Sequence, residues 1–201
     1  MSTYNAIRYN VDYTKVGSLK LISTQTASSS SSVSFTSGID STYDEYWFIF
    51  NNVHPATDSV FFSFNGSTDG GSNYNVTKTT NFFSAQHDES GASSGLSYRS
   101  GSDVAQGTGY APLTRNAGNL SDESSSGILK LYNPSSTTYV KHFTAALNVY
   151  NQNDRTTEDL SGGYLNTTSA INAIDFKFSS GNIDDGTIQL FGVKQWVHTM
   201  Q

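Results

Sequence analysis

The stretch FKFSSGNIDDGTIQLFGV (residues 176–193) consists of two alternating, aromatic-bearing runs joined by a polar loop rich in Gly, Asn and Asp. Side chains alternate between the two faces of a β-strand, so Phe176 and Phe178 fall on one face of the first run. Asp175 and Lys177 fall on the other face. Two such runs with a turn-forming loop between them predict a β-hairpin that completes a sheet.

Similar patterns recur along most of the chain. The run EYWFIFNNV (45–53) is nearly all apolar, which is typical of a strand buried on both faces. Residues 138–151 place apolar side chains at even separations, which favours a strand over the alternative of a helix. The glycines of STDGGSNYN (67–75) suit a tight hairpin turn. The serines of TASSSSS (26–32) are interpreted as a surface loop, with a weakly specified strand edge as the alternative. We therefore predict an all-β protein, an antiparallel β-sandwich or jelly roll of roughly ten strands.

The composition supports this fold class and argues against several functions. The chain has 201 residues, of which 13% are aromatic and only 14% charged, so strands and turns are favoured over helices. A formal net charge of −6 argues against nucleic-acid binding, which needs Lys or Arg to neutralise phosphates. No apolar run approaches the roughly 20 residues of a membrane span, so no membrane insertion is expected. The absence of cysteine excludes disulfide bonds, Cys-bound zinc and thiol catalysis.

The sequence divides into an N-terminal arm, one domain and a C-terminal tail. Residues 1–18 fit neither a helix nor a strand pattern and are predicted to form an extended arm that docks on a neighbouring subunit. Residues 19–193 are predicted to form the β-sandwich domain, and residues 194–201 the tail. Aromatic side chains outside a strand pattern are typical of interfaces. The candidate assembly contacts in the arm and the tail are Tyr4, Ile7, Tyr9, Val11, Tyr13 and Trp196.

The stretch between residues 88 and 126 has few apolar residues and many glycines, which predicts long loops with short strands. Binding residues are often found on such loops, and tyrosines on an open face can stack on sugar rings or anchor a protein partner. The candidate receptor-facing residues are Tyr98, Arg99, Tyr110 and Arg115.

Acidic and histidine patterns do not predict a catalytic or metal site. Adjacent carboxylates are interpreted as solvated surface, because neighbouring side chains on a strand point to opposite faces and all but the first pair fall in predicted loops. These pairs are Asp44-Glu45, Asp88-Glu89, Asp122-Glu123 and Asp184-Asp185. The four histidines lack zinc-site spacing, and no nucleophile-elbow or phosphate-loop motif occurs. Oxygen-rich turns at 67–75 and 182–186 leave calcium binding open, but no cofactor is predicted and the chain is not expected to be an enzyme.

Three stretches resemble a known group of proteins. They are GIDSTYDEYWFIFNNVHPATDSVFFSFNGSTDGGSNYN (38–75), LKLYNPSSTTYVKHF (129–143) and GGYLNTTSAINAIDFKFSSGNIDDGTIQLFGV (162–193). From about Leu19 to about Val193 the chain is similar to small virion structural proteins of tailed phages, especially phages of aquatic bacteria and cyanobacteria. The resemblance implies a β-sandwich in a phage particle and gives no catalytic motif.

The resemblance also implies a location and a set of partners. The chain is expected in the virion after synthesis in the host bacterial cytoplasm, since no signal peptide is visible. Expected partners are other virion proteins of capsid or tail, copies of the chain itself as a trimer, and host-surface glycan. The first hypothesis is a fibre or appendage subunit that assembles symmetrically and contacts the host. The alternative is a head-decoration, or cement, protein that stabilises the capsid through its arm. A third class of function, a carbohydrate-degrading enzyme of the particle, would require separated carboxylates that converge in a cleft.

Overall fold

The computed structural model describes residues 19–193, which form twelve β-strands and no helix. In chain order the strands are β1 (Leu19–Ser30), β2 (Val33–Phe35), β3 (Glu45–Pro55), β4 (Phe62–Ser67), β5 (Lys78–Asp88), β6 (Ser94–Tyr98), β7 (Ala111–Pro112), β8 (Ser125–Tyr132), β9 (Lys141–Asn151), β10 (Arg155–Leu165), β11 (Ala173–Phe178) and β12 (Ile183–Val193). The all-β prediction is confirmed. The count exceeds the expected one partly because β7, with two residues, is too short to show alternation. In this part of the chain no helix is long and apolar enough to cross a membrane.

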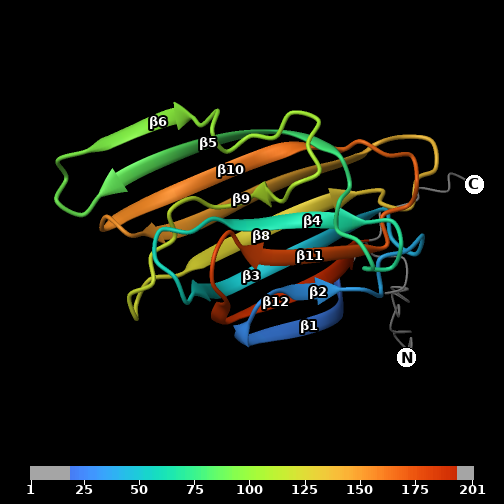
Figure 1. Cartoon of the computed structure of the whole chain (residues 1–201), viewed down its shortest axis with the longest axis horizontal. Helices are drawn as coiled ribbons and strands as arrows, with labels where there is room; N and C mark the ends of the chain where they lie inside the picture. The colour runs from blue at the N-terminus through green and yellow to red at the C-terminus, as the bar shows by residue number, and fades with distance from the viewer. Residues whose placement is uncertain (1–18, 194–201) are drawn as a thin grey trace, which may run out of the picture.

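The strands form two antiparallel sheets packed face to face as a β-sandwich (Figure 1). The larger sheet has eight strands in the order β1-β12-β3-β8-β9-β10-β5-β6, and the smaller has four in the order β2-β11-β4-β7. Figure 1 shows the smaller sheet over β3, β8 and β12, while β10, β5 and β6 extend beyond it. The inner face of the larger sheet therefore has two parts with different covers.

The hydrophobic core lies between the smaller sheet and the part of the larger sheet beneath it. The Phe176 ring of β11 is at its centre, with centroid distances of 5.1 Å to both Phe48 and Phe50 and 5.9 Å to Phe62. The contacts with Phe48 and Phe50 are edge-to-face and the contact with Phe62 is stacked. Both arrangements add to the free energy gained by burying the rings. Among residues 19–193, β5 and β6 contribute nothing to this core, and β10 contributes only Leu165.

The last two strands do not form the predicted hairpin. β11 pairs with β2 and β4 in the smaller sheet, whereas β12 pairs with β1 and β3 in the larger sheet. The polar loop of residues 179–182 therefore carries the chain from one layer to the other. The prediction was wrong because alternation shows which face of a strand is apolar, but not which strand lies beside it.

The Asp-Gly-Gly turn is also not a hairpin. Gly70 and Gly71 have positive φ angles of 72° and 91°, as the turn prediction required. The strands on either side nevertheless separate, with β4 in the smaller sheet and β5 in the larger one. A glycine turn lets the chain reverse direction but does not fix the sheet to which the next strand belongs.

Two local predictions about burial and loops were wrong. For residues 26–32 the favoured loop was wrong and the alternative, a strand edge, is observed, because β1 extends to Ser30 and pairs with β12 at the edge of the larger sheet. Small polar side chains suit such a solvent-facing edge. β3 is not buried on both faces: every second side chain is buried, while Trp47 and Ile49 on the outer face are partly exposed. No described residue forms a layer over that outer face.

The predicted arm (1–18) and tail (194–201) lie outside the described residues. The assembly contacts proposed there stay predictions: Tyr4, Ile7, Tyr9, Val11, Tyr13 and Trp196.

Candidate binding site

The inner face of β10 and β5, beyond the smaller sheet, is polar. Thr157, Asp159 and Ser161 alternate along β10 and all point inward, where each is at least 95% buried. Ser84 of β5 is paired with Asp159 across the two strands and is equally buried. Because alternate residues of a strand share a face, this hydroxyl-rich surface follows directly from the sequence TEDLS of β10.

The segment of residues 99–118 covers this polar surface and is fixed by backbone hydrogen bonds. The Arg99 amide donates to the Phe82 carbonyl at 2.8 Å, immediately after β6 ends. The buried Lys78 of β5 holds the segment further along, because its Nζ donates to the Gly109 carbonyl at 2.6 Å. Burial lowers the pKa of Lys78 to about 8. The Leu113 amide then donates to a carbonyl of β4, so the segment reaches from the larger sheet to the smaller one.

Asp159 is the buried carboxylate at the centre of this region. The Ser84 hydroxyl donates to its Oδ1 at 2.5 Å, and the Arg115 backbone amide donates to its Oδ2 at 2.8 Å. Burial raises the pKa of Asp159 to about 6, against the opposing effects of these two hydrogen bonds and of the charges on Arg115 and Arg99. Both carboxylate oxygens therefore already have partners within the fold.

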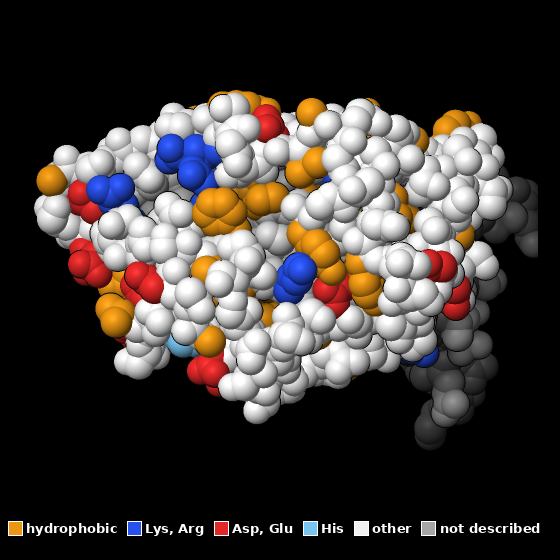
Figure 2. Space-filling view, in the orientation of Figure 1, with side chains coloured by type: hydrophobic (Ala, Val, Ile, Leu, Met, Phe, Trp, Pro, Cys, Tyr) orange, Lys and Arg blue, Asp and Glu red, His pale blue; other side chains and the backbone are white. Residues whose placement is uncertain are grey.

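Two guanidinium groups lie over Asp159. The Arg99 Nη2 donates to Gln86 Oε1 at 3.3 Å, and the Arg115 guanidinium lies 5.7 Å from the centre of the Phe61 ring. Burial lowers the pKa of Arg115, and the nearby charge of Arg99 lowers it further. In the described part of the chain, the buried Nε of each arginine has no hydrogen-bond partner. Figure 2 shows Lys and Arg side chains gathered over the end of the larger sheet where β5, β6 and β10 lie.

The structure brings together only two of the four candidate receptor-facing residues. Arg99 and Arg115 share the site over Asp159. Tyr98 lies on the opposite, outer face of the sheet, is 60% exposed and donates its hydroxyl to Asp103 at 2.5 Å. Tyr110 is held against the smaller sheet, where its hydroxyl donates to an oxygen of Asp175 at 2.8 Å.

Sequence reasoning missed the buried partners of the two arginines, Asp159 and Ser84. A usable signal was present, since Asp159 occupies the same strand face as the core residue Leu165. An acidic side chain on a core-facing position indicates a buried polar site when partners can reach it.

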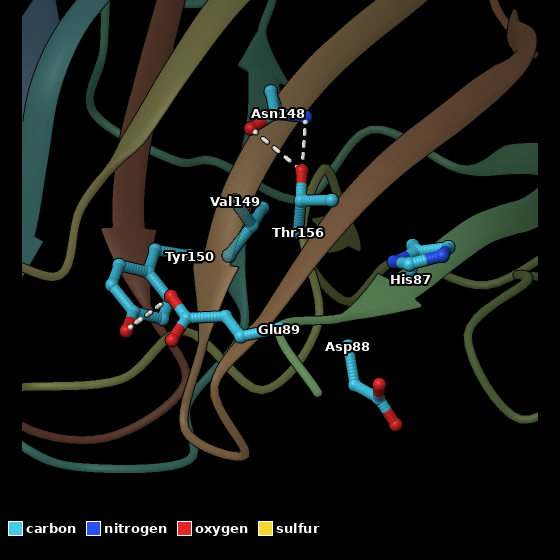
Figure 3. A pocket seen from close by; sticks show the side chains of 7 residues that line it. All are labelled: His87, Asp88, Glu89, Asn148, Val149, Tyr150 and Thr156. Carbon is cyan, nitrogen blue, oxygen red and sulfur yellow. Dashed lines mark hydrogen bonds between the residues drawn. The ribbon is translucent and has the colours of Figure 1, made fainter. Parts of the chain in front are cut away.

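A second hollow lies where the turns at the ends of β5 and β9 meet, and Figure 3 shows its lining. It has a volume of about 440 Å³. The Tyr150 hydroxyl donates to Glu89 Oε1 at 3.0 Å, and this bond is the main reason why the pKa of Tyr150 is raised to about 12. Asp88 points away from this pair in Figure 3. The hollow could hold a hydroxylated molecule, but its two carboxylates do not converge on one point.

A third hollow, of about 690 Å³, brings two of the four acidic pairs together with His54. The interpretation of all pairs as solvated surface was wrong for Glu123, which is 2% exposed and accepts a hydrogen bond from the Leu120 amide. It was also wrong to place Asp184 and Asp185 in a loop, since both belong to β12. Within residues 19–193, however, no three His, Asp or Glu side chains are placed to hold a metal ion.

Comparison with protein-family models, with curated proteins and with solved structures gives no match to this chain.

Proposed function

We propose that this chain is a non-enzymatic structural subunit of a tailed-phage virion, a fibre or appendage protein that assembles symmetrically and contacts the host surface. The proposal is supported by the resemblance between residues 19 and 193 and phage virion structural proteins. A β-sandwich of this kind is compatible with that role, although the fold alone does not determine function.

The observation that carries the assembly part of the proposal is an apolar patch on the outer face of the larger sheet. Phe83, Leu96 and Tyr98 are 37%, 73% and 60% exposed. Phe83 pairs with Tyr98, and Leu96 is two residue pairs further along the same two strands and on the same face, so the three side chains lie together. Within residues 19–193, β6 is also an edge strand, with backbone groups on one side that no other strand pairs. A second copy of the chain would bury this patch and protect that edge.

The non-enzymatic part is supported by what the buried carboxylates do. Asp159 accepts hydrogen bonds at both oxygens, and Glu123 accepts one from the backbone of its own loop. Glycoside hydrolysis requires two carboxylates facing one bond across a cleft. These two carboxylates belong to different regions, and each is bound to backbone atoms of the fold.

Electron microscopy of intact virions labelled with a gold-conjugated antibody against this chain tests the proposal. We expect label on the tail or on projecting fibres. Label spread evenly over the head would favour the head-decoration alternative. If no label appears and the chain is also missing from the mass spectrum of purified particles, the virion role is refuted in both forms.

A further inference from the structure

Three of the four arginines in the chain lie on the inner side of the larger sheet, over the part that the smaller sheet does not cover. Arg99 and Arg115 lie over Asp159, and Arg155 is on β10 with its side chain on the same face as Asp159. In residues 19–193 the buried Nε of each of the three lacks a hydrogen-bond partner. A chain with a net charge of −6 thus concentrates its guanidinium groups on one face.

The two guanidinium groups of Arg99 and Arg115 carry more positive charge than the carboxylate beneath them can neutralise. Asp159 supplies one negative charge beneath two guanidinium groups, and its oxygens are already occupied by Ser84 and by the backbone amide of Arg115. Two like charges held close together in a partly buried position repel each other unless a counter-charge is near. The backbone bonds of residues 99–118 nevertheless fix both arginines in place.

We propose that Arg99 and Arg115 form a binding site for an oxyanion, a carboxylate or a phosphate ester, carried by an acidic saccharide. A guanidinium group presents a planar pair of N–H donors that matches the oxygens of a carboxylate or phosphate. Two such groups on rigid backbone lose little conformational entropy on binding, which favours affinity. Arg155 lies opposite Asp88 of β5 and close enough for its charge to act on that carboxylate, so the proposed site consists of Arg99 and Arg115 alone.

The surroundings of the arginines favour a saccharide over other anions. The Phe61 ring next to Arg115 is partly exposed and offers an apolar face on which a sugar ring can stack. The Gln86 amide next to Arg99 can bond to sugar hydroxyls. A nucleic acid would instead require positive charge along an extended track, and the remainder of the chain is acidic.

This inference goes beyond the proposed function and depends on it only for the natural source of the saccharide, which would be the host surface. The test therefore uses the purified full-length chain without any particle. Isothermal titration calorimetry at low salt would compare three probes: an oligogalacturonate, which carries carboxylates, a neutral oligogalactan, and glucose 1-phosphate. We expect one of the two acidic probes to bind and the neutral one not to bind; the acidic probe that binds identifies the anion.

The decisive variant is the double substitution Arg99→Gln with Arg115→Gln. We expect it to weaken binding of the acidic probe by about tenfold or more, because charge-assisted hydrogen bonds are lost. The matched control is Lys130→Gln with Lys177→Gln, which removes the same two charges elsewhere and should keep the affinity. If the arginine double variant does not fold, Arg99→Gln alone replaces it, since its only described side-chain bond is the one to Gln86.

Several results would overturn the inference. They are no binding of either acidic probe, equal binding of the neutral oligosaccharide, and unchanged affinity in the arginine variant. Equal loss of affinity in the lysine control would show that only net charge matters. Tight binding of single-stranded DNA, in competition with the acidic saccharide, would replace the saccharide with a general polyanion. None of these results bears on whether the chain is part of a virion.

Discussion

The two parts of the inner face of the larger sheet bury different kinds of side chain, apolar in one part and polar in the other. Under the smaller sheet, the face is apolar and packs aromatic rings around Phe176. Under residues 99–118, the face presents Asp159 with hydroxyl side chains, and the cover presents arginines. The backbone pairing is regular across both parts, since β9 and β10 pair along their whole length.

The difference shows that the covering element decides what a sheet face can carry. A second sheet presents alternating side chains with no free backbone donors, so only apolar residues pack well against it. An irregular segment presents backbone amides as well, and one of these, from Arg115, stabilises the Asp159 carboxylate. A loop cover can therefore support a buried charge where a sheet cover could not.

The largest effect on the free energy of unfolding is expected for Phe176→Ala. This change removes the ring that contacts Phe35, Phe48, Phe50 and Phe62 in the core. We expect the free energy of unfolding to fall by about 3–5 kcal/mol, measured by urea denaturation.

The comparison variant for that change is Phe82→Ala on the polar part of the same face. Phe82 is fully buried but lies outside the core cluster. If the two parts differ as described, Phe82→Ala should cost at least about 1 kcal/mol less than Phe176→Ala. Equal losses would mean that the polar part is packed as tightly as the core.

Asp159→Asn should change how stability depends on pH. The folded pKa of Asp159 is about 6, above the ordinary value of 3.8, so the folded state holds the proton more tightly. Its contribution to stability is fully present below the ordinary pKa and is lost as pH rises through about 6. Between about pH 4 and about pH 7, the wild type should lose on the order of 2 kcal/mol relative to the variant.

Urea denaturation of both proteins across that pH range measures this difference. Asp69 has a pKa lowered to about 2 by hydrogen bonds from Ser67 and Asn73, so its titration falls below the window. Subtracting one curve from the other also removes contributions that the two proteins share. If the free energy of unfolding depended on pH in the same way in both proteins, Asp159 would be charged across the whole pH range. Its hydrogen bonds and the nearby arginines would then offset the effect of burial on its pKa.

Removing the guanidinium charges should have a smaller effect on stability. In the variant Arg99→Gln with Arg115→Gln, the repulsion between two cations and their attraction to Asp159 disappear together. The free energy of unfolding should change by less than about 1 kcal/mol at neutral pH. The pKa of Asp159 should rise further, because both arginines lower it. Carboxyl carbon chemical shifts across a pH titration measure that change, and a downward shift would contradict the assigned geometry.

The strands and their buried faces were largely predictable from the sequence, but their partners were not. Alternation in residues 141–151 and 173–178 correctly indicated strands with one apolar face. The error at residues 176–193 arose because a polar four-residue loop suits both a hairpin and a crossing between layers. Which one forms depends on the free energy of burying Phe176 between two sheets, a long-range effect that a local pattern does not contain.

The candidate site was predictable only in part, for a similar reason. Arg99 and Arg115 were predicted as site residues because they lie in a glycine-rich segment with few apolar residues. Asp159 was not predicted as a site residue, because its partners Ser84 and Arg115 are 75 and 44 residues away along the chain. A buried carboxylate cannot be distinguished from a surface one until the elements that cover it are known.

The smallest effect on stability, and the most specific one on assembly, is expected at the exposed edge. In the variant Leu96→Ser with Tyr98→Ser, two side chains that are 73% and 60% exposed are shortened, so the free energy of unfolding should change by less than about 0.5 kcal/mol. If this patch joins copies of the chain, light scattering should show a loss of oligomer at equal concentration. The control is Tyr139→Ser, which shortens a side chain that is 71% exposed just before β9 and should leave assembly unchanged. An oligomer that survives the edge substitutions would mean that the outer face of β5 and β6 meets solvent, and that assembly uses another surface.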